Sequence, residues 1–87
     1  MCNVEKIASC QIAFTPIVSD DYIDDVKRVL DIINNSGLEN SVGVLSTFVR
    51  GEKNKVLKLI ADIYEAMDGE TKFSMDIKIS NLCGCGK

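Results

Sequence analysis

The order of the periodic segments constrains the fold of this chain more than any other feature of its sequence. Four segments alternate apolar with polar residues, and this period of two is typical of half-buried β-strands. Two further segments repeat apolar residues every three to four positions, as amphipathic helices do. Because these patterns follow one another in the order β-α-β-β-α-β, we expect an α+β fold.

The first and last strands have the clearest alternation. We expect the first strand over Lys6 to Phe14, with Cys10 on its apolar face. We expect Thr15 and Pro16 to end it, because proline has no N–H to donate to a ladder. The last strand has one apolar and one polar face. Its apolar positions are Phe73, Met75, Ile77 and Ile79.

The middle of the chain predicts a pair of short strands, over Ser41–Leu45 and Thr47–Arg50. Ser46 lies at or near the turn or bulge between them. The parity of the residues that follow the turn is therefore not fixed by the pattern alone.

The first helix is expected to start at Ser19-Asp20-Asp21, since short polar side chains cap free N–H groups, and to end before Gly37. The second is expected to follow Gly51-Glu52-Lys53-Asn54 and to close at Gly69. The apolar stripe of the first is Tyr22, Val26, Val29, Leu30 and Ile33. The stripe of the second is Val56, Leu57, Ile60, Ile63, Tyr64 and Met67.

Two helices with one apolar stripe each can cover one face of a four-stranded sheet. This is the ferredoxin-like βαββαβ sandwich. Right-handed crossovers then give an antiparallel sheet with the strand order 4-1-3-2. The 87 residues suit a single domain, residues 1–87, with a core over about residues 6–80 and a cysteine-containing tail over 81–87. A domain this small is marginally stable, so oligomerisation is a natural way to bury more surface.

Charge and residue usage exclude several classes of function. The chain contains no histidine, which excludes a histidine-based triad and a Cys/His zinc site. A net charge of −3 argues against nucleic acid and anionic membranes as partners. No apolar run is long enough for a signal peptide or a membrane span, so we expect a cytoplasmic protein with reduced cysteines.

The polar face of the expected sheet is one candidate site. Gln11 should lie in the middle of a central strand, where a long amide suits recognition of a ligand. A solvated sheet face and a face packed against another subunit are alternative interpretations, and the first is the commoner outcome. The residues that alternation collects there are Ser9, Gln11, Ala13, Ser74, Asp76 and Lys78.

The cysteines are the other candidate. In the expected topology Cys2 approaches Cys83 and Cys85, and three thiolates would suit a soft metal or a redox pair. No fourth ligand is evident, because Cys10 belongs to the core. A tail with incidental thiols is therefore the simpler interpretation.

Three motifs, taken in order, resemble one known family. They are Cys10-Gln11-Ile12-Ala13-Phe14-Thr15-Pro16, then Asn35-Ser36-Gly37-Leu38, then the hairpin from Val42 to Glu52. Together they resemble the thiamine-binding protein family, also called YkoF-related, over about Ser9 to Ser80. The sequence departs from the usual pattern at Val44-Leu45, where the family often has proline and methionine.

The resemblance implies a ferredoxin-like fold and non-catalytic binding of thiamine or its hydroxymethylpyrimidine part, without a cofactor. It also implies a homodimer or homotetramer. We expect Gln11 to bind the polar edge of a heterocycle, with Ser46 and Thr47 closing the site if Thr47 shares the face of Gln11. A thiol-based metal or redox module using Cys2, Cys83 and Cys85 is the alternative. The positions that match the family pattern are Gln11, Thr15, Pro16, Ser46, Thr47, Gly51 and Glu52.

Overall fold

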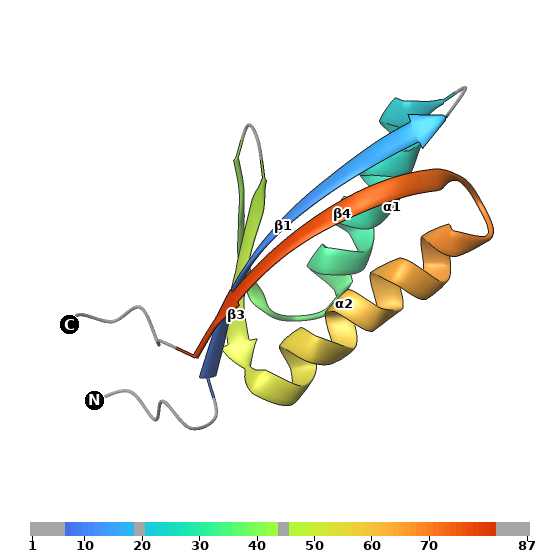
Figure 1. Ribbon diagram of the computed structural model, residues 1–87. Coiled ribbons are helices and arrows are strands. Elements are labelled where there is room, and N and C mark those ends of the chain that lie inside the picture. Colours follow the sequence, from blue (N-terminus) through green and yellow to red (C-terminus); the bar gives the residue numbers. More distant parts are fainter. Residues whose placement is uncertain (1–6, 19–20, 44–45, 82–87) are drawn as a thin grey trace.

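The computed structural model describes residues 7–18, 21–43 and 46–81. Its elements follow the predicted order (Figure 1). They are β1 (Ile7–Val18), α1 (Tyr22–Asn35), β2 (Glu39–Val42), β3 (Thr47–Glu52), α2 (Lys53–Asp68) and β4 (Lys72–Ser80).

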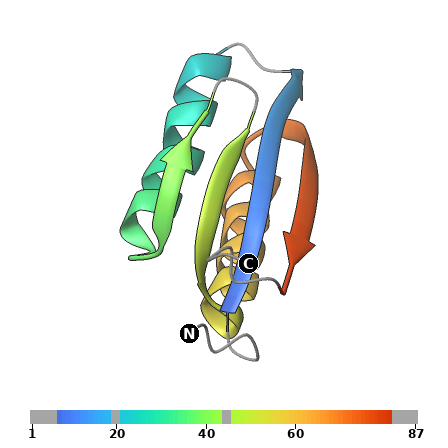
Figure 2. The ribbon, with the colours of Figure 1, turned by 90° about the vertical axis from the view of Figure 1, so that its left-hand side faces the viewer.

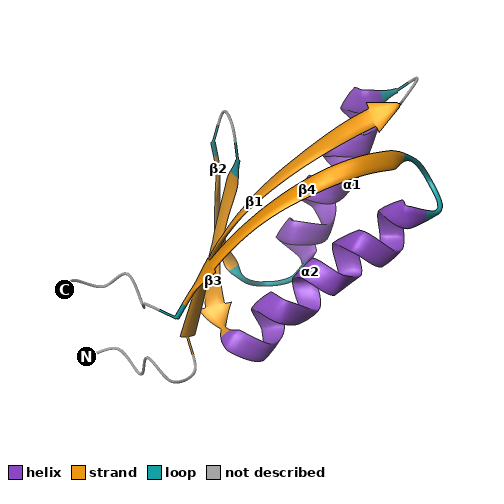
Figure 3. Cartoon of the chain, in the orientation of Figure 1, coloured by secondary structure: helices purple, strands orange, loops and turns teal. Residues whose placement is uncertain are grey.

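The strands form one antiparallel sheet in the order β2-β3-β1-β4, which is the predicted order 4-1-3-2 read from the other edge. Figure 2 shows β2 and β4 at the two edges of this sheet. Both helices cover the same face, so the molecule has two layers (Figure 3). The ferredoxin-like fold is confirmed.

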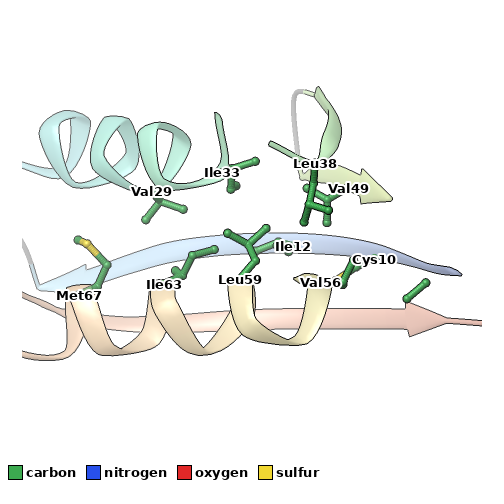
Figure 4. Packing of buried hydrophobic residues seen from close by; sticks show 11 residues of the cluster. Cys10, Ile12, Val29, Ile33, Leu38, Val49, Val56, Leu59, Ile63 and Met67 are labelled. Carbon is green, nitrogen blue, oxygen red and sulfur yellow. The ribbon is translucent and has the colours of Figure 1, made fainter. Parts of the chain in front are cut away.

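The core lies between the sheet and the helices (Figure 4). Cys10 is 2% exposed, as its position on the apolar face of β1 predicted. Burial raises the pKa of its thiol above the ordinary value of 9.0, because the thiolate would lose its hydration. The buried apolar residues are Ala8, Cys10, Ile12, Val29, Ile33, Leu38, Val49, Val56, Leu59, Ile63 and Met67.

Several strand boundaries differ from the prediction. β1 does not end at Pro16, which pairs with Phe73 of β4, and the register shifts only between Pro16 and Val18. Within the described residues β1 pairs with β3 no further than Ile12, so its second half has a strand on one side only. Proline is tolerated where one side of a strand is open. β2 begins and ends earlier than expected, at Glu39 and Val42.

The helices bury a narrower stripe than expected. Val29 and Ile33 of α1 are buried, whereas Tyr22 is 56% exposed. In α2, Leu59 is buried although it was absent from the predicted stripe, while Leu57 and Tyr64 are about half exposed. Steps of three or four residues place Val56, Leu59, Ile63 and Met67 on one side of the helix, which leaves Leu57 and Tyr64 on its flank.

The helix ends agree only in part with the prediction. Gly37 has a φ of 79° after α1, as a terminating glycine does. Asp21 occupies the first capping position but makes no side-chain bond to the helix backbone. A hydrogen bond with Asp21, and next the charge of Asp21, instead raise the pKa of the Asp24 carboxyl. Ser19 and Asp20 lie outside the described residues.

Candidate functional site

A small cavity lies between α1 and the end of the β2–β3 hairpin. Its volume is about 120 Å³, and most of its wall is aliphatic or aromatic. β1 and α1 supply only apolar side chains, and the hairpin supplies the polar ones. The lining residues are Ile12, Phe14, Val26, Val29, Leu30, Ile33, Val42, Gly43, Ser46 and Thr47.

The polar groups of this cavity come from Ser46 and Thr47. Thr47 is only 7% exposed, and its side chain and that of Ser46 both line the cavity. The hairpin is held there by its backbone, because the Gly43 N–H donates to the Ser46 carbonyl oxygen at 2.8 Å. The cavity thus offers two hydroxyls, each able to donate and accept, in mainly apolar surroundings.

Strand register places Thr47 in this cavity. Thr47 pairs with Ile12 of β1, which is buried on the helix side of the sheet. Gln11, the neighbour of Ile12, points to the opposite face because successive side chains in a strand alternate. Thr47 therefore does not share a face with Gln11, and the condition for their convergence is not met.

Gln11 lies on the open face, in a row of side chains that crosses all four strands. The register pairs it with Phe48 of β3 on one side and Lys78 of β4 on the other, and Phe48 pairs with Ser41 of β2. Gln11 is exposed and Phe48 is half-buried. This row is a second candidate site, in which the Phe48 ring and the Gln11 amide occupy paired positions.

The remaining predicted site residues lie at opposite ends of β1. Thr15 and Pro16 are near its carboxyl end, whereas Gly51 and Glu52 pair with Ala8 and Ile7 at its start. The seven strand positions from Ala8 to Thr15 correspond to about 23 Å. One small ligand cannot contact both groups at once.

The cysteine alternative falls on Cys2, Cys83 and Cys85, which lie outside the described residues. Within the part of the chain that the structure describes, no three Cys, Asp or Glu side chains are grouped to hold a metal ion.

No helix in the described part of the chain is long and apolar enough to cross a membrane.

The prediction assigned Val26 and Leu30 to the core and did not identify them as walls of a cavity. β1 runs on past Ile12 without β3 beside it, so the first half of α1 is only partly covered by the sheet. The sequence signal for this gap is the shortness of the hairpin strands beside the long strand and helix.

The fold and this cavity define a ferredoxin-like α+β domain with a small, mainly apolar pocket beside one helix. The model of the YkoF-related family matches residues 7–85, and the chain belongs to that family. No curated protein matches the sequence.

Several solved structures share the fold. One is a Thermotoga maritima protein assigned provisionally to thiamine biosynthesis or salvage, with 20% identity, a TM-score of 0.77, and coverage of 85% of this chain and 82% of that one. A Bacillus cereus domain of unknown function has 19% identity and a TM-score of 0.79, covering 99% and 86%. A Streptococcus pneumoniae protein has 20% identity and a TM-score of 0.79, covering 85% and 84%.

Proposed function

We propose that this protein binds thiamine, or its hydroxymethylpyrimidine part, without catalysis, in the cavity between α1 and the β2–β3 hairpin. The observation that carries the proposal is a mainly apolar cavity with two hydroxyl-bearing side chains, Ser46 and Thr47, in its wall. Membership of the YkoF-related family supports the ligand class, as does the likeness to the Thermotoga maritima protein. The proposal includes a cytoplasmic homodimer or homotetramer.

The size of the cavity selects the part of the ligand that enters it. An apolar cavity of roughly 150 Å³ holds one benzene ring, so about 120 Å³ suits a single six-membered heterocycle. Ser46 and Thr47 would then exchange hydrogen bonds with the ring nitrogens or the exocyclic amine of a pyrimidine. The rest of thiamine, with its cationic thiazolium, would extend through the open side.

An acidic segment adjoins the cavity along the chain. Val26, which lines the cavity, directly follows Asp24 and Asp25 in the first turn of α1. Negative charge on this turn of α1 favours a cation over an anion in its neighbourhood. Thiamine and its pyrimidine part should therefore be favoured over thiamine phosphates.

Calorimetric titration of thiamine and of hydroxymethylpyrimidine tests this proposal. Thr47→Val removes one hydroxyl and keeps the shape of the side chain. The loss of one hydrogen bond to a buried ligand group costs about 1–3 kcal/mol, so the dissociation constant should rise about tenfold or more.

Gln11→Ala is the matched control, because Gln11 lies on the other face of the sheet. If Gln11→Ala weakens binding and Thr47→Val does not, the ligand lies on the open face and the cavity assignment is wrong. If neither compound binds at millimolar concentration, the thiamine proposal itself fails.

A further inference from the structure

The second half of β1 has no strand beside it on the β3 side. Within the described residues the pairing with β3 stops at Ile12, opposite Thr47, while the pairing with β4 continues to Val18. Figure 1 shows β1 and the hairpin diverging toward the end of β1. An unpaired strand edge presents main-chain N–H and C=O groups to which matching groups can bind. Residues of both β1 and the hairpin line the cavity, so the cavity lies at this open edge.

One hydrogen bond in the hairpin shows which main-chain groups face the open edge. In an antiparallel pair of strands, hydrogen-bonded and non-hydrogen-bonded residue pairs alternate, and both groups of a hydrogen-bonded residue point to its partner. The Gly43 N–H donates to the Ser46 carbonyl oxygen, so the next pair, Val42 and Thr47, is of the non-hydrogen-bonded kind. The main-chain groups of Thr47 therefore point away from β2 and toward β1.

Alternation carries this direction along β1. Because Thr47 lies opposite Ile12, the main-chain groups of Ile12 point to β3, and those of Phe14, two residues further on, point to the same side. No described residue of β3 lies opposite Phe14. The neighbours of Phe14 in the chain point to β4 instead, where each has a paired residue. The N–H and C=O of Phe14 therefore face the gap that the cavity occupies.

Phe14 offers one donor and one acceptor at fixed positions. Pro16, the next residue on the same side, has no N–H, so the Phe14 N–H is the one donor that residues 13–16 direct to this edge. β4 is paired with the other side of β1 here, and the Phe14 ring packs against the Phe73 ring with centroids 5.0 Å apart. These contacts hold the two main-chain groups in place without a strand on the cavity side.

We propose that the main-chain N–H and C=O of Phe14 bind the amino edge of the pyrimidine ring, so that the site selects 4-aminopyrimidines and rejects 4-oxopyrimidines. In a 4-aminopyrimidine, a ring nitrogen that accepts lies beside an amine that donates. The ring nitrogen would accept from the Phe14 N–H, and the amine would donate to the Phe14 carbonyl oxygen, as two paired strand residues do. This inference rests on the proposed function, because it concerns the same cavity and the same ligand.

A 4-oxopyrimidine presents the reverse pattern. Its ring nitrogen carries a hydrogen and its exocyclic oxygen accepts, so at Phe14 donor would face donor and acceptor would face acceptor. A main-chain amide cannot reverse its polarity, and polar groups that are buried without partners are costly. Phe14 thus discriminates by rejecting the wrong ring as well as by binding the right one.

The hydroxyls of the cavity cannot supply this selectivity. A hydroxyl rotates to donate or to accept, so Ser46 and Thr47 can adapt to either ring. They belong to the hairpin, whereas Phe14 belongs to β1 on the other side of the gap. The hydroxyls therefore suit the polar groups of the ring that Phe14 does not bind.

Calorimetric titration with thiamine and with oxythiamine, its 4-oxo analogue, tests the selectivity. Two hydrogen bonds are replaced by two unfavourable contacts, so oxythiamine should bind about a hundredfold more weakly or worse. Thr47→Val is the matched variant, because it should weaken the binding of both compounds and leave the ratio of their dissociation constants unchanged. A ratio near one for the wild type, or a ratio that is lost in Thr47→Val, would overturn the inference and leave thiamine binding intact.

NMR spectra of the ¹⁵N-labelled protein test the contact itself. Saturation with thiamine should shift the Phe14 amide proton downfield and slow its exchange with solvent, because this N–H gains an acceptor. The Ala13 and Thr15 amides are internal controls, since they point to β4 and should keep their exchange rates. If thiamine binds and the Phe14 amide does not respond, the main-chain contact is wrong. If calorimetry shows no binding of thiamine, the proposed function fails and this inference fails with it.

Discussion

Gly51 lies against the side chain of Leu38, with no room for a methyl group between them. A Cβ built at Gly51 would overlap Cδ2 of Leu38, a residue that is 8% exposed. We therefore expect Gly51→Ala to lower the free energy of unfolding by about 1–3 kcal/mol, the usual cost of overpacking. Urea unfolding measures this change. Gly69→Ala is the control, because nothing lies within 4 Å of its Cβ position, and it should be nearly neutral.

The thiol of Cys10 should react only when the protein unfolds. Cys10 is buried, and its raised pKa keeps it protonated where exposed thiols begin to ionise. Native alkylation followed by peptide mass spectrometry should leave Cys10 unmodified while Cys83 and Cys85 react. Since the folded state binds this proton more tightly, stability is unaffected well below pH 9.0 and falls as the pH rises through that value. Rapid native modification of Cys10 would contradict the observed burial.

The sequence predicted which side chains of one strand share a face. It did not predict which of these faces lies on the same side of the sheet as a given face of the next strand. Alternation placed Cys10 in the core and Gln11 on the open face, and both positions are confirmed. Thr47 follows a turn, and a shift of one residue at Ser46 reverses every side chain after it. Only the pairing of Thr47 with Ile12 determines that its hydroxyl lies in the cavity.

At the scale of elements, contacts with the sheet changed two features that the local sequence pattern had predicted. They are the end of β1 and the buried stripe of α2. Pro16 favoured an early end to β1, yet pairing with β4 carries this strand on to Val18. In α2 the predicted stripe included Leu57, but contact with the sheet selected Leu59. On a helix, a shift of about one position in sequence moves a side chain from the face that contacts the sheet to the flank beside it. The choice between them depends on where the sheet lies.

The first turn of α2 has an unfavourable charge, which gives a prediction for this element. The turn contains Lys53 and Lys55 but no acidic residue, so positive side chains lie at the positive end of the helix dipole. We expect Lys55→Glu to add about 0.5–1 kcal/mol to the free energy of unfolding and to raise the melting temperature by ~2–8 °C. Lys55→Gln should give about half of this gain. Equal melting temperatures for all three proteins would show that the dipole effect is negligible here.

At the scale of the whole molecule, the arrangement of strands was the most predictable property. The order of six elements, together with right-handed crossovers, leaves few ways to cover one sheet face with two helices. The cavity was less predictable, because it depends on the relative lengths of strands far apart in the chain.

The thermal stability of the whole molecule should depend on its concentration. Domains of this size are marginally stable, and the proposed association of two copies would add buried surface to each. Because association stabilises the folded state by mass action, a tenfold rise in protein concentration should raise the melting temperature by ~3–4 °C for a dimer of this size. Calorimetric scans over a hundredfold range measure it, and a constant melting temperature for the wild type would mean that the chain unfolds as a monomer.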